Sequence, residues 1–464
     1  MQKYTEQGSE STNCEEVIMK NKKRMVTNVV SLVLFLWFAS AVFAQEQTTG
    51  YSGDFWSRST LTGDWGGVRN EWAKKGVTID LNLTQVGQGN VSGGKDVGWE
   101  YGGRGNLTLN LNTQKMGLWP GGFFTVEVEG NFGNAVNDQT GALVPVNTNQ
   151  LWPTAGVDNL NIPNVTFTQF LAPYFGVLLG KLDTTMGDAN EFAHGKGDTQ
   201  FFNMAFNLDP AIGLTTPYSN LTAGVLILPT KDPSEAIIDI LAFDADGKAN
   251  TSGFDTVFKG NTTYAFEGRV RTNFFGMTGH QLLGATYSTK NFTSLDQNSF
   301  LLLKDIIQHV PLQIAKVDNS WCIYYNFDQY LYEPKKGQGI GVFGRFAATD
   351  GKANPIHYFY SIGMGGKGVI SGRPLDQFGI GYYYMNVSHP TLTGIIDQQF
   401  LRDEQGFEAY YNFAITPWMK LTPDIQIIRP AKSNLSVSSG LPPVINKASI
   451  DTATVLGLRL QVVF

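Results

Sequence analysis

The chain has 464 residues and a formal net charge of −6, with 42% hydrophobic, 12% aromatic and 16% charged residues. This composition excludes an intrinsically disordered chain, and the acidic balance argues against nucleic acid as a partner. Of the two cysteines, Cys14 lies in the predicted leader and Cys322 would remain alone, so no intramolecular disulfide is expected.

Residues 1–44 are predicted to be a leader and secretory signal peptide. An apolar run at residues 29–44 follows Lys23 and Arg24 and ends in Val42-Phe43-Ala44, which fits a cleavage site after Ala44. A membrane anchor is the alternative, but the run is short for a bilayer. The polar stretch before the basic residues is unusual for a signal, and translation from Met19 or Met25 would remove it.

Residues 45–76 are predicted to form a tether followed by one short helix. Val68 and Trp72 share a helical face, Arg69 and Glu71 lie opposite, and Gly76 suits the position just after a helix.

From Val77 to Phe464 the hydrophobic pattern has a period of two, which is typical of β-strands. Apolar residues alternate with polar ones at residues 77–84, 107–112, 124–129, 264–273, 407–415 and 456–464.

Two architectures show this alternation, a soluble sandwich and a transmembrane barrel. Residues 276–279 make a tight turn between two predicted strands, whereas the segment 293–317 is too long to be a tight turn. Short turns at one end and long loops at the other are typical of a barrel. We therefore expect an all-β fold: a transmembrane antiparallel β-barrel over residues 77–464, in the bacterial outer membrane.

No enzyme motif is convincing, and we expect neither catalysis nor a cofactor. The glycine pattern of residues 363–368 fits G-x-G-x-x-G, but no helix follows, so a glycine-rich loop is the better interpretation. The five histidines show no metal-ligand spacing, and no serine lies in a G-x-S-x-G context. We expect no metal site.

Several motifs resemble the carbohydrate-selective porins of the OprB type. They are Leu61-Thr62-Gly63-Asp64-Trp65-Gly66-Gly67-Val68-Arg69, Leu179-Gly180-Lys181-Leu182-Asp183, Val342-Phe343-Gly344-Arg345-Phe346, Ser371-Gly372-Arg373-Pro374 and Thr454-Val455-Leu456-Gly457-Leu458-Arg459-Leu460. The resemblance spans nearly all of residues 61–464 and implies about sixteen strands and passage of sugars, usually glucose. The match is loose at residues 202–206, and residues 188–197 are particular to this chain, so these segments are candidates to narrow the pore.

Charged residues on the polar phase of the strands are expected to line the lumen, because a charge facing lipid at the midplane costs about 2 to 4 kcal/mol. The period-two alternation would place Lys181 and Asp183 on the outward face, so we expect a bulge near Gly180 or a strand end there. The resemblance favours a functional position for both residues. The predicted pore-lining and sugar-binding residues are Glu127, Glu129, Lys181, Asp183, Glu267, Arg269, Arg271, Arg345, Glu408 and Arg459.

The predicted function is passive, selective diffusion of carbohydrates of the glucose type. The alternatives are a general or anion-selective porin and an outer-membrane hydrolase. The expected partners are small sugars and outer-membrane lipid, and an oligomer is compatible with the sequence.

Overall fold

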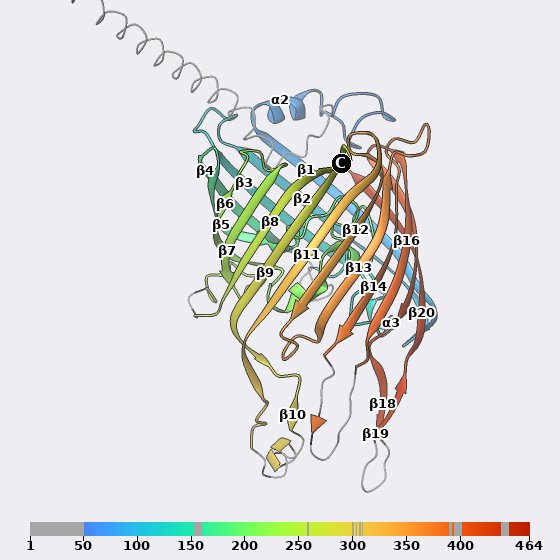
Figure 1. Cartoon of the computed structure of the whole chain (residues 1–464). Helices are drawn as coiled ribbons and strands as arrows, with labels where there is room; N and C mark the ends of the chain where they lie inside the picture. Colours follow the sequence, from blue (N-terminus) through green and yellow to red (C-terminus); the bar gives the residue numbers. More distant parts are fainter. Residues whose placement is uncertain are drawn as a thin grey trace, which may run out of the picture.

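The computed structural model describes residues 51–464 apart from 153–159, 258, 299–300, 303, 306–307, 309, 389–391, 394–400 and 438–444. Sixteen antiparallel strands form one closed barrel, in which the first strand pairs with the last (Figure 1). This confirms the predicted fold class. The barrel strands are β1 (Val77–Gly94), β2 (Gly98–Asn112), β3 (Gly122–Gly133), β4 (Leu160–Ala172), β5 (Phe175–Asp183), β6 (Ser219–Ile227), β7 (Ala236–Asp244), β8 (Thr262–Phe274), β9 (Met277–Thr293), β11 (Lys316–Lys335), β12 (Gln338–Thr349), β13 (Ile356–Lys367), β14 (Gln377–Val387), β16 (Glu404–Thr416), β17 (Met419–Arg429) and β20 (Asp451–Val463).

Shorter elements do not belong to the barrel sheet. Two small sheets, β10 (Gln297–Asn298) with β15 (Leu392–Thr393) and β18 (Ser433–Val437) with β19 (Ile445–Ser449), extend from the barrel. The helical elements whose bounds lie within the described residues are α2 (Val68–Lys74), α3 (Asn137–Thr140), η2 (Thr184–Met186), α4 (Met204–Asn207) and η3 (Pro210–Leu214). Among the described residues, no helix has the length and apolarity needed to cross a bilayer.

The two ends of the barrel differ in the length of their connections. At one end, Phe275 and Gly276 alone join β8 to β9, and both have positive φ (57° and 77°), as tight two-residue hairpins require. At the other end, residues 294–315 separate β9 from β11, and long connections carry β10, β18 and β19 (Figure 1). The predicted contrast between a tight turn and a long loop is confirmed, but the turn was predicted at residues 276–279, of which 277–279 belong to β9.

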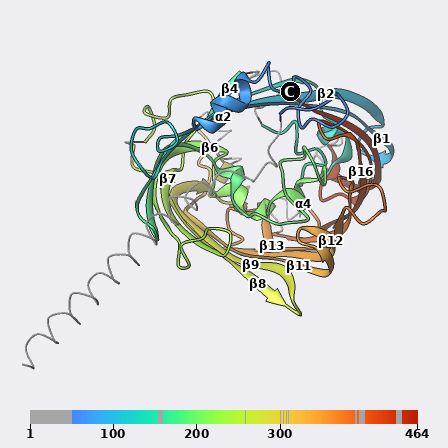
Figure 2. The ribbon, with the colours of Figure 1, turned by 90° about the horizontal axis from the view of Figure 1, so that it is seen from above.

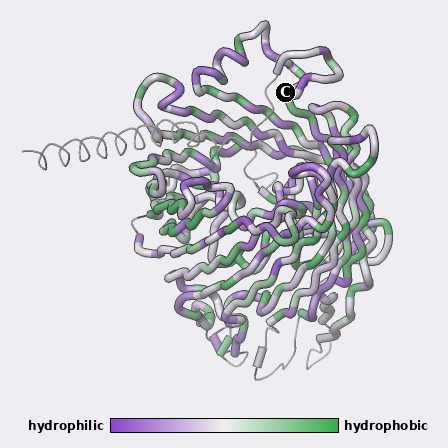
Figure 3. Tube along the Cα trace, turned by 45° about the horizontal axis from the view of Figure 1, so that its top comes forward, coloured by the Kyte–Doolittle hydropathy of each residue, from purple (hydrophilic) through white to green (hydrophobic). Residues whose placement is uncertain are grey.

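The strands place apolar side chains outward and polar ones toward the lumen. In β1, Leu81 is 39% exposed, whereas Thr84 is buried. In β16, Phe413 is exposed while Glu408 is fully buried inside. Figure 3 shows the resulting alternation of hydrophobic and hydrophilic residues along the strands. An apolar outer surface suits lipid, and a closed ladder leaves no unpaired strand edge in the bilayer.

The N-terminal segment lies against the seam at which the barrel closes. Helix α2 occupies the predicted position, and Gly76 follows it with φ 84°. The buried residue of this helix is Arg69, whereas Val68 and Trp72 are exposed. The Arg69 guanidinium donates to the carbonyl oxygens of Phe464 (2.9 Å) and Ile79 (2.7 Å). One side chain thereby joins the N-terminal helix to both strands of the seam.

We expect deletion of Phe464 to reduce the amount of assembled barrel several-fold. Its backbone N–H donates to Leu81 (2.8 Å) and its carbonyl accepts from Arg69, so the deletion removes backbone bonds at the seam. The measurement is the fraction of protein that migrates faster on a gel when unheated. Phe464→Leu keeps both backbone bonds and should assemble better than the deletion; equal assembly of parent and deletion would contradict the role of this seam.

The predicted leader, signal peptide and tether (residues 1–50) lie outside the described residues and remain predictions.

Candidate functional site

The connection between β5 and β6, residues 184–218, folds back into the barrel. In the view along the axis, α4 of this connection lies inside the ring of strands (Figure 2). We call residues 184–218 the lumen loop. Its four phenylalanines, Phe192, Phe201, Phe202 and Phe206, are all at most 4% exposed. The loop is therefore packed against the wall and narrows the lumen.

Glycines of the facing strands allow this close packing. A Cβ atom at Gly379 would lie 2.7 Å from the Phe201 ring, and one at Gly381 would lie 2.5 Å from the Phe206 ring. Gly365, in the G-x-G-x-x-G pattern, receives Phe192 in the same way. The expectation of a glycine-rich loop at residues 363–368 is wrong, because residues 363–367 belong to β13. The absence of a side chain at Gly365 makes room for the Phe192 ring.

Arg345 of β12 holds the lumen loop by its guanidinium group. Its Nε lies 2.7 Å from Oδ2 of Asp188, and its Nη2 donates to the carbonyl of Ala193 (2.6 Å). Nη1 donates to the carbonyl of Phe206 at 3.2 Å. Arg345 is fully buried, so it fixes the loop at three places and is not presented to solvent in the passage.

Glu408 and Arg459 hold a second part of the loop. Glu408 accepts hydrogen bonds from the backbone N–H groups of Phe202 (2.5 Å) and Asn203 (3.0 Å). Arg459 donates to the carbonyls of Gly197 (2.7 Å) and Gln200 (2.9 Å). Both side chains face the lumen as predicted, but the lumen loop covers them.

Glu267 of β8 also holds the first part of the loop. Its Oε2 accepts from the backbone N–H of Asp188 (2.9 Å) and from the Tyr324 hydroxyl (2.8 Å). Asp188 therefore contacts both Arg345 of β12 and Glu267 of β8, strands that only β9 and β11 separate in the barrel.

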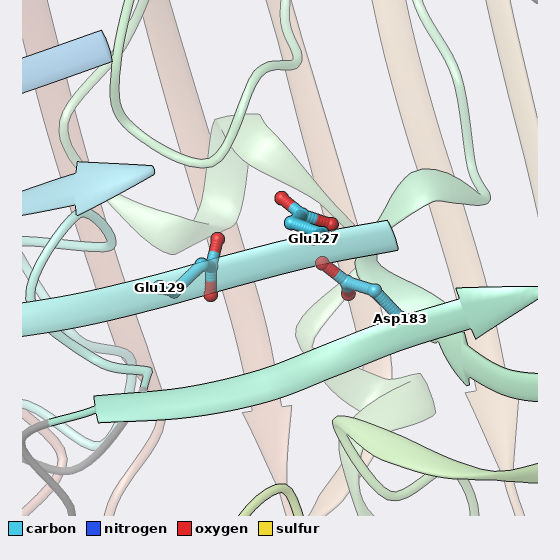
Figure 4. A group of neighbouring side chains, drawn as sticks. All are labelled: Glu127, Glu129 and Asp183. Carbon is cyan, nitrogen blue, oxygen red and sulfur yellow. The ribbon is translucent and has the colours of Figure 1, made fainter. Parts of the chain in front are cut away.

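Three carboxylates from two strands meet at the base of the loop. Glu127 and Glu129 of β3 and Asp183 of β5 point toward one another (Figure 4), and one oxygen from each lies within 4.8 Å of the others. This spacing would suit a metal ion. The loop instead supplies Lys196, whose Nζ lies 2.7 Å from Glu129 and 2.6 Å from Asp183.

The electrostatic balance at this cluster favours the charged lysine. Burial alone lowers the pKa of Lys196, but the carboxylates of Asp183 and Glu129 outweigh burial and raise that pKa above its ordinary value. The buried ammonium thus neutralises part of the carboxylate charge and ties the loop to β3 and β5.

Lys181 does not line the lumen, which corrects the prediction. It shares the outward face with its paired neighbours Val165 and Leu221, and its amine donates to the carbonyl of Ala249 (2.7 Å) in the β7–β8 connection. The pairing of β5 with β6 runs through Gly180 to Asp183 without a register shift, so the expected bulge near Gly180 is not seen in this ladder. The pairing with β4 ends at Lys181 and the strand itself ends at Asp183, shortly after Gly180. Gly180 adopts φ 129°, which only glycine tolerates well, and this lets the strand continue.

The two arginines of β8 lie at different levels. Arg271 pairs with Glu235, in the short connection between β6 and β7, so it belongs to the mouth at the short-turn end. Arg269 is one lumen-facing position deeper, and its buried Nε has no hydrogen-bond partner among the described residues. Of the two, only Arg269 retains hydrogen-bonding capacity near the loop.

A cavity of about 500 Å³ remains between the lumen loop and strands β5–β9 and β11. Its polar lining includes Asp183, Asp188, Asp239, Glu267 and Tyr324. Asp239 was not among the predicted site residues. The available signal was that it is the only charged residue within the apolar run at residues 236–243.

Acidic pH is expected to loosen the lumen loop through His194. Burial, and next the Arg345 guanidinium, lower the pKa of His194 to about 4. In the released loop the pKa of His194 would return to its ordinary value near 6.5, so protonation favours release. The contribution of His194 to the stability of the packed loop is present above pH 6.5 and is lost as the pH falls toward 4. Single-channel recordings at pH 7.5 and 5 should show more frequent transitions to larger conductance at pH 5. His194→Gln should weaken this dependence; an unchanged pH response in that variant would count against the histidine.

Comparisons with known proteins agree with this geometry. The family model described as "Carbohydrate-selective porin, OprB family" matches residues 97–464. Porin B of Pseudomonas aeruginosa is 22% identical over 438 residues, covering 87% of this chain and 91% of that protein. Porin AaxA of Chlamydia pneumoniae is 28% identical over 164 residues, 35% of this chain and 33% of that protein.

Among solved structures, the high-pH structure of Pseudomonas putida OprB superposes with a TM-score of 0.71 at 19% identity, over 89% of this chain and 100% of that one. This likeness concerns the fold.

Proposed function

The chain belongs to the carbohydrate-selective porins of the OprB family and is a carbohydrate porin of the bacterial outer membrane, and we propose that it passes sugars of the glucose type by passive diffusion. The observation that carries the proposal is the lumen loop, which wall charges hold across the lumen. A barrel of sixteen strands would otherwise leave a wide aqueous channel. No bond is made or broken in this process.

The selectivity is proposed to lie in the cavity beside the loop. Asp239 and Glu267 are paired directly across β7 and β8 and both face the cavity, where their oxygens can accept hydrogen bonds from sugar hydroxyls. Arg269 is the next lumen-facing residue along β8 and is proposed to supply donors beside this cavity. Alternating acceptors and donors can replace the water around a sugar as it passes.

The outward face is proposed to contact outer-membrane lipid. Leu81, Phe266 and Ile425 are examples of its exposed apolar side chains. An oligomer would cover part of this face.

Swelling of liposomes that contain the purified protein tests the function. We expect glucose to enter several-fold faster than a disaccharide and than gluconate, an anion of similar size. Similar rates for glucose and gluconate would indicate a general porin instead, and faster gluconate would indicate an anion-selective one.

A further inference from the structure

One sector of the lumen wall is apolar, which is unusual for a channel that carries water and sugars. On β7, Ile237, Leu241 and Phe243 face the cavity, and Leu226 of β6 and Leu178 of β5 continue this surface. The outward residues of β7 are also apolar, so this strand lacks the alternation seen in most of the barrel. Contact with lipid explains the apolar residues on the outward face of β7 but not those that face the lumen.

The lumen loop presents a second apolar surface to the same space. Met186, Met204, Leu208 and Ile212 line the cavity from the loop side. The two surfaces do not close on each other, because a cavity of about 500 Å³ separates them. Sites for small organic molecules are typically about 300 to 1,000 Å³ and mostly apolar, with few polar groups.

The polar atoms that remain in this cavity need hydrogen-bond donors or acceptors. Oδ1 of Asp239 and Oγ1 of Thr216 are buried and have no hydrogen-bond partner among the described residues. Both residues line the cavity, as does the stacked pair of Trp152 and Tyr218, whose ring centroids lie 5.3 Å apart. A buried polar atom without a partner is costly, and a ligand hydroxyl would relieve this cost.

We propose that this cavity is a binding subsite for glycosides that carry an aryl or alkyl group. The sugar hydroxyls would bond to Asp239 and Thr216, and the apolar group would lie between β7 and the loop. A free hexose would satisfy the polar atoms but leave the apolar walls in contact with water, which is weakly held there. This inference rests on the proposed passage of sugars and adds the class of substrate.

Block of ion current in planar bilayers tests the proposal, with phenyl β-D-glucoside and glucose as probes of the full-length mature protein. The half-blocking concentration should be at least tenfold lower for the phenyl glucoside. The double variant Ile237→Thr/Leu241→Thr should lose this difference while glucose block persists, since threonine suits a strand but makes the wall polar. Ile238→Thr, on the outward face of the same strand, is the matched control and should behave as the parent.

Each outcome bears on one of the two proposals. Equal block by both probes in the parent, or an unchanged difference in the double variant, would overturn the apolar subsite and leave the sugar channel standing. Block by the phenyl glucoside without block by glucose would support the subsite and argue against glucose-type sugars as the substrate. A lack of block by either probe would overturn both. Gel migration before and after heating shows that each variant has formed the barrel.

Discussion

Arg345→Ala is expected to at least double the single-channel conductance and to weaken glucose block about tenfold. The substitution removes the ion pair with Asp188 and the bonds to the carbonyls of Ala193 and Phe206. Removing one partner of a buried pair costs about 3 to 5 kcal/mol, since the other charge stays buried and unpaired. A loss of about 3 kcal/mol changes the ratio of packed to released loop by roughly a hundredfold.

The matched control for this experiment is Arg373→Ala. Arg373 also pairs with a carboxylate, that of Asp376 in the connection between β13 and β14, but its guanidinium is 41% exposed. Asp376 keeps hydrogen bonds from Tyr411 and from the backbone N–H of Ala414. Because the arginine is solvated and the pair does not touch the lumen loop, conductance should stay at the parent value. If Arg345→Ala leaves both conductance and glucose block unchanged, the arginine does not hold the loop in the lumen.

Lys196→Met is expected to shift the channel several-fold toward cations. The variant leaves the carboxylates of Glu127, Glu129 and Asp183 without the ammonium that now lies between them. Asp183 also lines the cavity, so uncompensated charge there acts on permeating ions. The reversal potential in a tenfold salt gradient measures the shift.

Lys290→Met is the control for Lys196, because Lys290 pairs with Asp246 at a partly exposed position. Its reversal potential should match the parent. A reversal potential for Lys196→Met that also equals the parent value would mean that the carboxylate cluster does not influence the passage. Added Ca²⁺ should block Lys196→Met more strongly than the parent, since three neighbouring carboxylates then offer hard oxygen ligands.

The fold could be predicted from the sequence because the membrane restricts the polarity of each strand position. Lipid requires an apolar outer face, and the lumen accepts polar side chains, so period-two alternation marks most strands directly. Strand β7 was not recognised from this alternation because both of its faces are apolar. Gly363 and Gly365 were assigned to a loop because the sequence does not reveal that rings of other segments occupy the space beside them.

The candidate site was predicted in part. The polar phase correctly placed Glu408, Arg345 and Arg459 toward the lumen, but it could not show that a loop far away in the chain would bind them. Lys181 was misplaced because a polar residue on the outward phase suggested a bulge, whereas a carbonyl from another connection receives its amine. Such contacts depend on loop conformation, and loops carry no periodic pattern.

The most direct test of the account is liposome swelling by a variant in which a short Gly-Ser linker replaces residues 189–209 of the lumen loop. The strands pair with one another independently of the loop, so the barrel should form, as gel migration before and after heating would show. We predict that a trisaccharide then enters nearly as fast as glucose, whereas the parent admits it at least tenfold more slowly. If the shortened protein forms a barrel and keeps the parent's discrimination between the two sugars, the lumen loop does not set the passage for sugars.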